Sequence, residues 1–316
     1  DSDLAYRAGL LAKADLISDM VFEFTDLQGI IGKYYARAHG ETEIVANAIE
    51  QQYWPKYSGA ELPDTKVANC VALAEKLDTL VGIFGIGQNP TGNKDPFALR
   101  RSAIGVLRIL RDTGLDLVLD DVVDLAISSY SDVNKVSLVE KTKNDVVSFC
   151  LDRLKNMYKE EGVSADIFES VNSINFGSIA DFSSRVNAVI KFSKLPQAAN
   201  LIVSTKRVSN ILSKNETAII GEYDISLAKC DKDTYELDLA NKLMEISNKS
   251  DLLVGNKDYF KALETITTLD SEISDFFENV MVMDEDIKIC NNRILLLKHI
   301  NNMFKNIADI WSIDLV

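Results

Sequence analysis

Histidine and cysteine are scarce in this sequence, and their positions limit the chemistry that the chain can perform. The two histidines, His39 and His299, lie almost the whole chain apart, which argues against a histidine-based metal site. The cysteines form no C-x-x-C pair, and each stands in an apolar, periodic run, where cysteine usually packs as a small buried hydrophobe. They are Cys70, Cys150, Cys230 and Cys290. We therefore expect reduced thiols and a cytoplasmic protein without a bound metal.

Long hydrophobic runs are also missing. No segment approaches the roughly 18 consecutive apolar residues that a membrane span needs. The first residues, DSDLAYRAGLLAKADL, contain neither a starting Met nor a basic region followed by an apolar core. From this we expect no signal peptide, no membrane partner and a piece of a longer chain.

Basic residues are outnumbered, with 34 Lys and Arg against 48 Asp and Glu, so the net charge is −14. A non-specific nucleic-acid coat needs a broad basic field, and this balance argues against it, so we expect no DNA partner. This charge balance is still compatible with a local basic face that binds one RNA of defined shape.

The hydrophobic pattern is helical along the whole chain, whose 316 residues are enough for two domains. Residues 4–38 have apolar positions at three- and four-residue spacing, and Gly29 and Gly32 inside this run predict a kink or a close helix contact. Residues 67–86 are so apolar that they should form the central helix of a first domain. No period-2 segment, hairpin turn or internal repeat is present. The predicted fold class is all-α.

The clearest boundary is Asp95-Pro96, which predicts a helix with Asp95 as its N-cap and Pro96 at its first position. This helix, FALRRSAIGVLRILR, carries a partial basic strip. The strip consists of Arg100, Arg101, Arg108 and Arg111. Asp78 lies between Leu77 and Leu80 on the apolar helix before it, and a buried charge there needs a partner. We expect Arg100, Arg101 or Lys76 to be that partner, so Asp78 and Asp95 have structural roles.

The sequence argues against two kinds of active site. Gly87 and Gly92 have the G-x-x-x-x-G spacing of a P-loop, but Lys94 comes late and Asp95 puts a negative charge where a phosphate would lie. A metal phosphohydrolase of the HD type needs several histidines and a literal His-Asp pair, which this sequence does not contain. A turn and a helix cap are the simpler interpretation, and we predict no catalytic residue.

Two further groups of residues combine basic side chains, which bind phosphates, with amides, which bind base edges in RNA. Lys206 and Arg207 precede Asn210 by about one turn, and Asn292 and Arg293 precede Lys298. The alternative is a non-catalytic helical scaffold, in which the same residues only pair with the many carboxylates.

Several stretches resemble the β subunit of bacterial tetrameric glycyl-tRNA synthetase, in the same order as in that family. They are AKADLISDMVFEFTDLQGIIGKYYA, GETEIVANAIEQQYWP, LAEKLDTLVGIFGIGQNPTGNKDPFALRRSAIGVLRIL, TKRVSNIL, and DFFENVMVM with NNRILLL. The resemblance covers the chain end to end, is densest over residues 13–111 and is weakest over residues 115–192. Two positions depart from the family pattern, because Glu75 replaces an aspartate and Cys290 replaces a basic residue near Asn292-Arg293, where Lys288 could compensate.

The resemblance implies roughly the second half of that β subunit. It implies an HD-like helical domain over residues 1–132, a helical linker over 133–199, and an anticodon-binding domain similar to that of arginyl-tRNA synthetases over 200–316. The partners would be glycine tRNA and the α subunit, which carries the active site with ATP and glycine; this chain would hold no cofactor. The implied tRNA-binding residues are Lys206, Arg207, Asn210, Asn292, Arg293 and Lys298, with Arg100 and Arg101 as further candidates.

Overall fold

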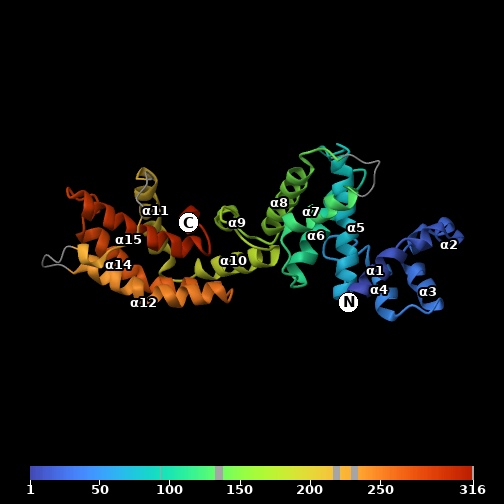
Figure 1. Ribbon diagram of the computed structural model, residues 1–316, viewed down its shortest axis with the longest axis horizontal. Helices are drawn as coiled ribbons and strands as arrows, with labels where there is room; N and C mark the ends of the chain where they lie inside the picture. Colours follow the sequence, from blue (N-terminus) through green and yellow to red (C-terminus); the bar gives the residue numbers. More distant parts are fainter. Residues whose placement is uncertain (93, 132–137, 216–220, 229–233, 315–316) are drawn as a thin grey trace. The chain divides into compact units, whose positions relative to one another are not determined.

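A computed structural model describes residues 1–92, 94–131, 138–215, 221–228 and 234–314. The described residues form helices, and outside them there is one isolated β-bridge, between Thr91 and Lys94. The prediction of an all-α chain is confirmed (Figure 1). Among the described residues, no helix combines the length and hydrophobicity that would let it cross a bilayer.

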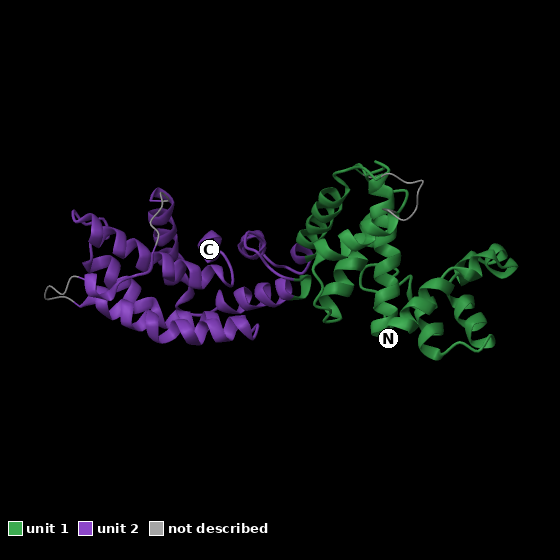
Figure 2. Cartoon of the chain, viewed as in Figure 1, with its two compact units in different colours: residues 1–157, 178–180 green, residues 158–177, 181–316 purple. Residues whose placement is uncertain are grey.

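The chain divides into two compact units (Figure 2). The first contains residues 1–157 and 178–180, and the second contains residues 158–177 and 181–316. The region predicted as a linker, 133–199, is thus divided between both units. The predicted boundary between residues 132 and 133 lies outside the described residues.

The helices of the first unit are α1 (Ser2–Leu11), α2 (Asp19–Glu23), α3 (Ile30–Ala38), α4 (Glu43–Gln51), α5 (Lys66–Gly85), α6 (Leu99–Asp112), α7 (Leu119–Ser131) and most of α8 (Thr142–Glu160). As predicted, α5 is central, because it contacts α1, α4, α6 and α7. Thr65 caps its start by accepting a hydrogen bond from the backbone N–H of Ala68. The side chains of Val71, Leu77 and Leu80 on α5 are buried in the core that these helices share.

The predicted long helical run at the start is broken into short segments. Ser18 begins α2 by accepting from the backbone N–H of Val21, although the bond is long at 3.4 Å. Gly29 has a φ of 78° and begins α3, a conformation that favours glycine. Gly32 lies so close to α4 that an added Cβ would stand 3.0 Å from Ile49 and from the Asp15 side chain. Gly32 therefore makes the predicted close helix contact, and Gly29 marks the break between α2 and α3 where a kink was predicted.

The helices of the second unit are α9 (Ala165–Asn172), most of α10 (Ile179–Phe192), α11 (Ala198–Lys214), α12 (Tyr235–Gly255), α13 (Tyr259–Ile266), α14 (Asp270–Asn279) and α15 (Ile287–Lys305). Here α12 contacts α13, α14 and α15, and α11 contacts α14 and α15. The side chains of Leu243, Phe276 and Leu297 are buried where these helices meet.

A buried polar cluster ties α10 to α13 and to the end of α15. The Arg185 side chain donates to Asp181 over 2.7 Å and to the backbone carbonyls of Asn306 and Ile307 over 2.6 and 3.1 Å. Tyr259 on α13 donates its hydroxyl hydrogen to the other oxygen of Asp181. Since buried charges are stable only when they are paired and hydrogen-bonded, this cluster fixes how the three elements pack.

Candidate nucleic-acid interface

The predicted residues on α11 lie on its exposed side. The buried positions of α11 recur at helical spacing and face the bundle; they are Ala198, Leu201, Ile202, Thr205 and Val208. Arg207 and Asn210 are exposed on the other side. The guanidinium carbon of Arg207 lies 4.4 Å from the centre of the Phe277 ring on α14, a cation–π contact that restrains the side chain. Lys206 is partly exposed and pairs with Asp314 over 2.6 Å.

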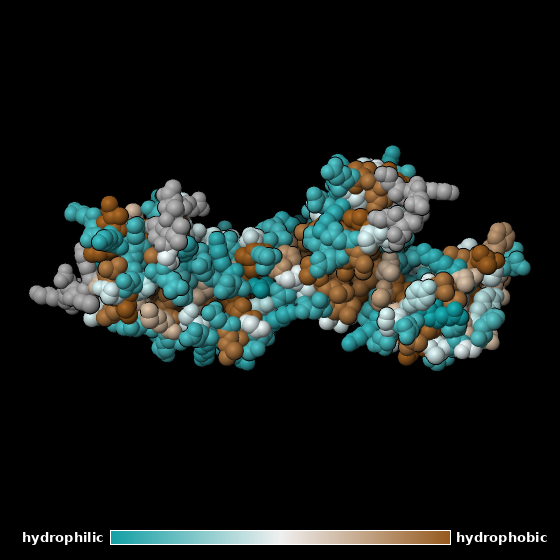
Figure 3. Space-filling model, viewed as in Figure 1, coloured by the Kyte–Doolittle hydropathy of each residue, from teal (hydrophilic) through white to brown (hydrophobic). Residues whose placement is uncertain are grey.

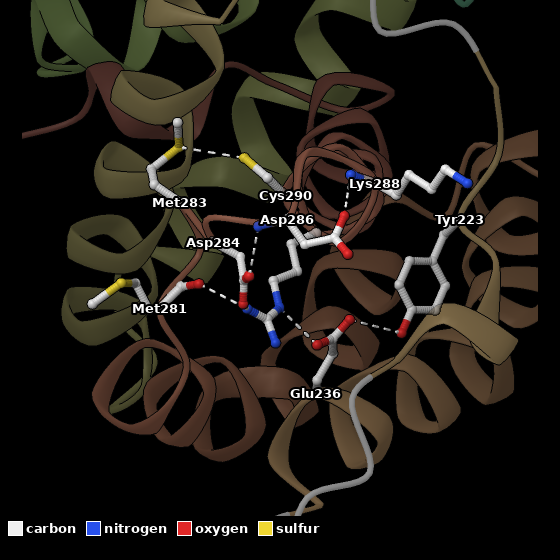
Figure 4. A network of polar contacts seen from close by, with 9 residues as sticks. Tyr223, Glu236, Met281, Met283, Asp284, Asp286, Lys288 and Cys290 are labelled. Carbon is white, nitrogen blue, oxygen red and sulfur yellow. Dashed lines mark hydrogen bonds and ion pairs between the residues drawn. The ribbon is translucent and has the colours of Figure 1, made fainter.

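On α15 the structure separates residues that the sequence had grouped. Lys298 is exposed, whereas Asn292 and Arg293 are only 2% and 5% exposed. Arg293 pairs with Glu236 of α12 over 2.7 Å and with Asp284 over 3.0 Å, and it donates to the carbonyl of Met281 over 2.8 Å (Figure 4). Its guanidinium therefore holds α12 and the segment before α15 together in the interior.

Asn292 fixes the segment that precedes α12. Its side chain accepts from the backbone N–H of Asp224 over 2.8 Å and donates to the carbonyl of Asp224 over 2.9 Å. The hydroxyl of Tyr223 donates to the second oxygen of Glu236 over 3.3 Å, so the carboxylate that holds Arg293 also holds Tyr223 (Figure 4). Asn292 and Arg293 thus support residues 221–224 from within instead of presenting their side chains at the surface.

These interior roles could not be recognised in the sequence, because α15 is buried on more than one side. Asn and Arg are usually exposed, and they stand among apolar residues that face several neighbours. One signal in the sequence could have predicted them. Glu236 lies among the apolar positions of the TYELDLA run, and in the structure it is only 3% exposed. A buried acid predicts a buried base somewhere else in the same unit.

A cavity of about 570 Å³ lies between α12, α15 and the segment that carries Tyr223. Its polar lining includes Tyr223, Lys298, His299, Asn302 and Asn306. The His299 ring nitrogen Nε2 and the Ser247 hydroxyl are 3.0 Å apart across it. Two acids, Glu222 and Asp251, also line the cavity. The apolar side chains of its wall are Ala240, Leu243, Met244, Leu295, Leu296 and Met303. The cavity combines ring surfaces with hydrogen-bonding groups, as sites for planar polar ligands do.

The predicted residues of the first unit have other surroundings. Asp78 is exposed and accepts a hydrogen bond from the Tyr130 hydroxyl over 2.8 Å. The prediction that Asp78 is buried and paired with Arg100, Arg101 or Lys76 is therefore wrong, because Asp78 lies on the side of α5 that faces α7. The buried residue is Lys76, two positions earlier.

Asp95 is not the N-cap of α6 as predicted, because the helix begins later and its N-cap residue is Ala98. The first helical residue is Leu99, not Pro96, because Ala98 has a left-handed conformation with a φ of 53°. The Asp95 carboxylate nevertheless accepts from the backbone N–H groups of Leu99 and Arg100 over 2.8 and 3.0 Å. Arg100 lies 3.8 Å from Asp95 and donates to the carbonyl of Gly92, so its side chain stabilises this turn.

Among the described residues, no group of three or more His, Cys, Asp or Glu side chains is placed to hold a metal ion. The described cysteines, Cys70, Cys150 and Cys290, are free.

Comparisons with known proteins match two separate ranges of the chain. Residues 2–173 match the family described as "Glycyl-tRNA synthetase beta subunit", and residues 201–316 match the family described as "DALR anticodon binding domain". The chain is thus a helical protein whose second unit contains a range similar to an anticodon-binding domain. It belongs to the glycyl-tRNA synthetase beta subunit family.

Similar proteins are named as glycine–tRNA ligase beta subunits. Those of Photorhabdus laumondii and of Acinetobacter baumannii are each 44% identical to this chain, over 98% and 97% of its length. The beta subunit of Colwellia psychrerythraea is also 44% identical, over 97% of the chain. The chain spans 44% of the length of each of these relatives.

Proposed function

We propose that the second unit binds the tRNA for glycine, and that the chain thereby supports the ATP-dependent ligation of glycine by a separate α subunit. The observation that carries the proposal is the match of residues 201–316 to an anticodon-binding domain, since this range includes the exposed cations of α11 and α15 and the cavity beside α15. The chain itself contributes RNA binding and no active site. We infer a cytoplasmic location, where tRNA is charged.

The exposed cations would hold the RNA backbone. Arg207 is restrained over Phe277, so its guanidinium loses little freedom when it binds a phosphate oxygen. Lys298 borders the cavity, and Lys206 would exchange its exposed partner Asp314 for a phosphate at little cost. Asn210 adds an amide that can donate or accept at a base edge or a ribose hydroxyl.

The cavity beside α15 would receive one unstacked base. Single-stranded loops of RNA are read by stacking bases on aromatic rings and by hydrogen bonds to their exposed edges. Tyr223 supplies the ring, and His299, Asn302 and Asn306 supply donors and acceptors. In this arrangement Asn292 and Arg293 act by positioning Tyr223.

The first unit offers surface for a protein partner. Hydrophobic residues are exposed on the face drawn in Figure 3. Several large exposed ones follow one another closely in the sequence between residues 10 and 24. Ile17, Phe22 and Phe24 are 92%, 80% and 62% exposed, respectively. Exposed apolar clusters of this kind mark interfaces between proteins, which supports an α subunit as the partner.

A salt titration of tRNA binding tests the proposal. The logarithm of the binding constant should fall linearly with the logarithm of the salt concentration, with a slope of roughly −0.7 to −0.9 per neutralised phosphate. Arg207→Ala and Lys298→Ala should each reduce the slope by about one such step. Lys249→Ala, which removes an exposed cation of α12 outside the cavity lining, is the matched control and should leave it unchanged. If the chain binds no tRNA at low salt, it is a helical scaffold and the proposal is wrong.

A further inference from the structure

A second polar cavity, of about 340 Å³, lies within the first unit between α5, α6 and the residues that follow α4. Three cations from three different segments line it: Lys56 after α4, Lys76 on α5 and Arg101 on α6. The hydroxyl groups of Thr79 and Ser102 lie in the same lining. The proposed function assigns no role to this cavity, because its RNA-binding residues all lie in the second unit.

Lys76 is the central feature of the cavity. The residue is only 6% exposed, and its Nζ has a single protein acceptor among the described residues, the backbone carbonyl of Gln52 at 3.1 Å. An ammonium group has three N–H donors, so two remain for a ligand or for water. Burial lowers the pKa of Lys76 to about 8, which its neighbour Glu75 only partly offsets.

The packing around Lys76 indicates that its position is specific. A Cβ on Gly105 of α6 would stand 2.6 Å from the Cε atom of Lys76, so the side chain passes over α6 only because residue 105 is glycine. A buried amine without a carboxylate partner is costly, and an anion in the cavity would remove that cost.

The carboxylates around the cavity leave the other cations available. Glu75 pairs with Lys13 over 2.7 Å, and Asp26 is exposed at the rim. Lys56 and Arg101 are exposed and have no ion-pair partner in the part of the chain that the structure describes. An anion in the cavity would therefore meet a buried amine, an exposed amine and a planar guanidinium.

We propose that this cavity binds a phosphoryl group, held by Lys76 and Arg101 with Lys56 at the rim. A phosphate presents its acceptor oxygens tetrahedrally, which suits cations that converge from three segments, with the Ser102 hydroxyl beside them, better than a planar carboxylate does. The Thr79 hydroxyl already donates to the backbone carbonyl of Glu75 over 3.0 Å. Arg101 supplies the paired donors that match phosphate geometry, and Lys76 supplies a concentrated charge. The phosphoryl group belongs either to a small phosphorylated compound or to the RNA backbone.

The first experiment titrates the 316-residue chain with inorganic phosphate and with pyrophosphate, with acetate at matched ionic strength as the comparison. Calorimetry should detect the two phosphates and give no signal for acetate. Arg101→Gln, an exposed position, should weaken binding by about tenfold or more, since a charge-assisted hydrogen bond is lost. Lys143→Met removes a first-unit lysine outside the cavity that pairs with Asp124, and should leave binding unchanged.

The second experiment tests Lys76 directly, without relying on a variant that has to fold. An amine-specific reagent is applied near pH 8, and labelling at each lysine is measured by mass spectrometry with and without phosphate. Phosphate should protect Lys76 and not Lys143. Lack of protection at saturating phosphate, or equal phosphate affinity in the original chain and Arg101→Gln, would overturn the proposal.

Binding of tRNA by Arg101→Gln distinguishes between the two sources of the phosphoryl group, a small phosphorylated compound and the RNA backbone. Unchanged tRNA affinity together with weakened phosphate binding assigns the site to a small compound. Weakened tRNA binding that phosphate competes away assigns it to the RNA backbone. The proposal for the second unit fails separately, because its tests use Arg207 and Lys298.

Discussion

Arg293 on α15 and Glu236 on α12 form an ion pair of 2.7 Å in which both side chains are less than a tenth exposed. The pair is not isolated, since Arg293 also reaches Asp284 and Glu236 also accepts from Tyr223. Removing one partner of such a pair leaves a charge buried without compensation, which is far more costly than losing a surface ion pair.

We therefore expect Arg293→Met to lower the unfolding free energy of the second unit by about 3–5 kcal/mol. Trp311 lies in the second unit and Trp54 in the first, so urea unfolding followed by fluorescence in a Trp54→Phe background reports on the second unit. Lys242→Met is the control, because it breaks a surface pair with Glu245 on the same helix as Glu236, and should cost less than about 1 kcal/mol. A similar small loss for Arg293→Met would contradict the structural role assigned to it.

The sequence was sufficient for the helical class, for the central position of α5 and for the resemblance to the family. Periodicity and apolar runs determine these features locally, and long motifs identify a family. The sequence was insufficient to predict that Arg293 and Asn292 are buried. Their burial depends on their partners Glu236 and Asp224, which lie 57 and 68 residues away in the chain. The prediction for Asp78 was wrong for a related reason. Leucines before and after a position on a helix do not decide whether that position itself faces the core, and Asp78 is exposed.

The start of α6 gives a second prediction. The Asp95 carboxylate accepts two backbone N–H groups of the first turn, so Asp95→Ala should cost about 1 kcal/mol, the typical value for a lost helix cap. Asp95→Asn keeps one side-chain oxygen as acceptor and should cost less. Urea unfolding with Trp54 as the probe, in a Trp311→Phe background, measures both. Glu61→Ala, at an exposed loop position, is the control, and an equal effect would argue against capping.

Lys76 predicts a dependence of stability on pH. Because burial lowers its pKa to about 8, the folded chain releases this proton near pH 8, whereas the unfolded chain keeps it up to the ordinary value of 10.5. Between these values the unfolded chain binds more protons, so the unfolding free energy rises with pH, by up to about 1.4 kcal/mol per pH unit. Below pH 8 both states are protonated, and the cost of burying the charge is constant.

The contribution of Lys76 is measured as a difference, because other groups titrate in the same range. Unfolding free energies of the original chain and of Lys76→Met are compared from pH 7 to pH 10. The difference should be constant up to about pH 7.5 and then change in favour of the original chain. A difference that stays constant to pH 10 would show that the amine keeps its ordinary pKa.

Tyr223 gives the sharpest test of the cavity beside α15. If a base stacks on this ring, Tyr223→Ala should weaken tRNA binding by about tenfold or more, since stacking on an aromatic side chain contributes roughly 1–3 kcal/mol per base. Tyr223→Phe is the matched control, because it keeps the ring and loses only the 3.3 Å hydrogen bond to Glu236. It should therefore bind nearly as well as the original chain. Fluorescence anisotropy with labelled tRNA measures both variants at one salt concentration. If Tyr223→Ala also binds normally while Arg207→Ala does not, the RNA is held by its backbone alone and the cavity has another use.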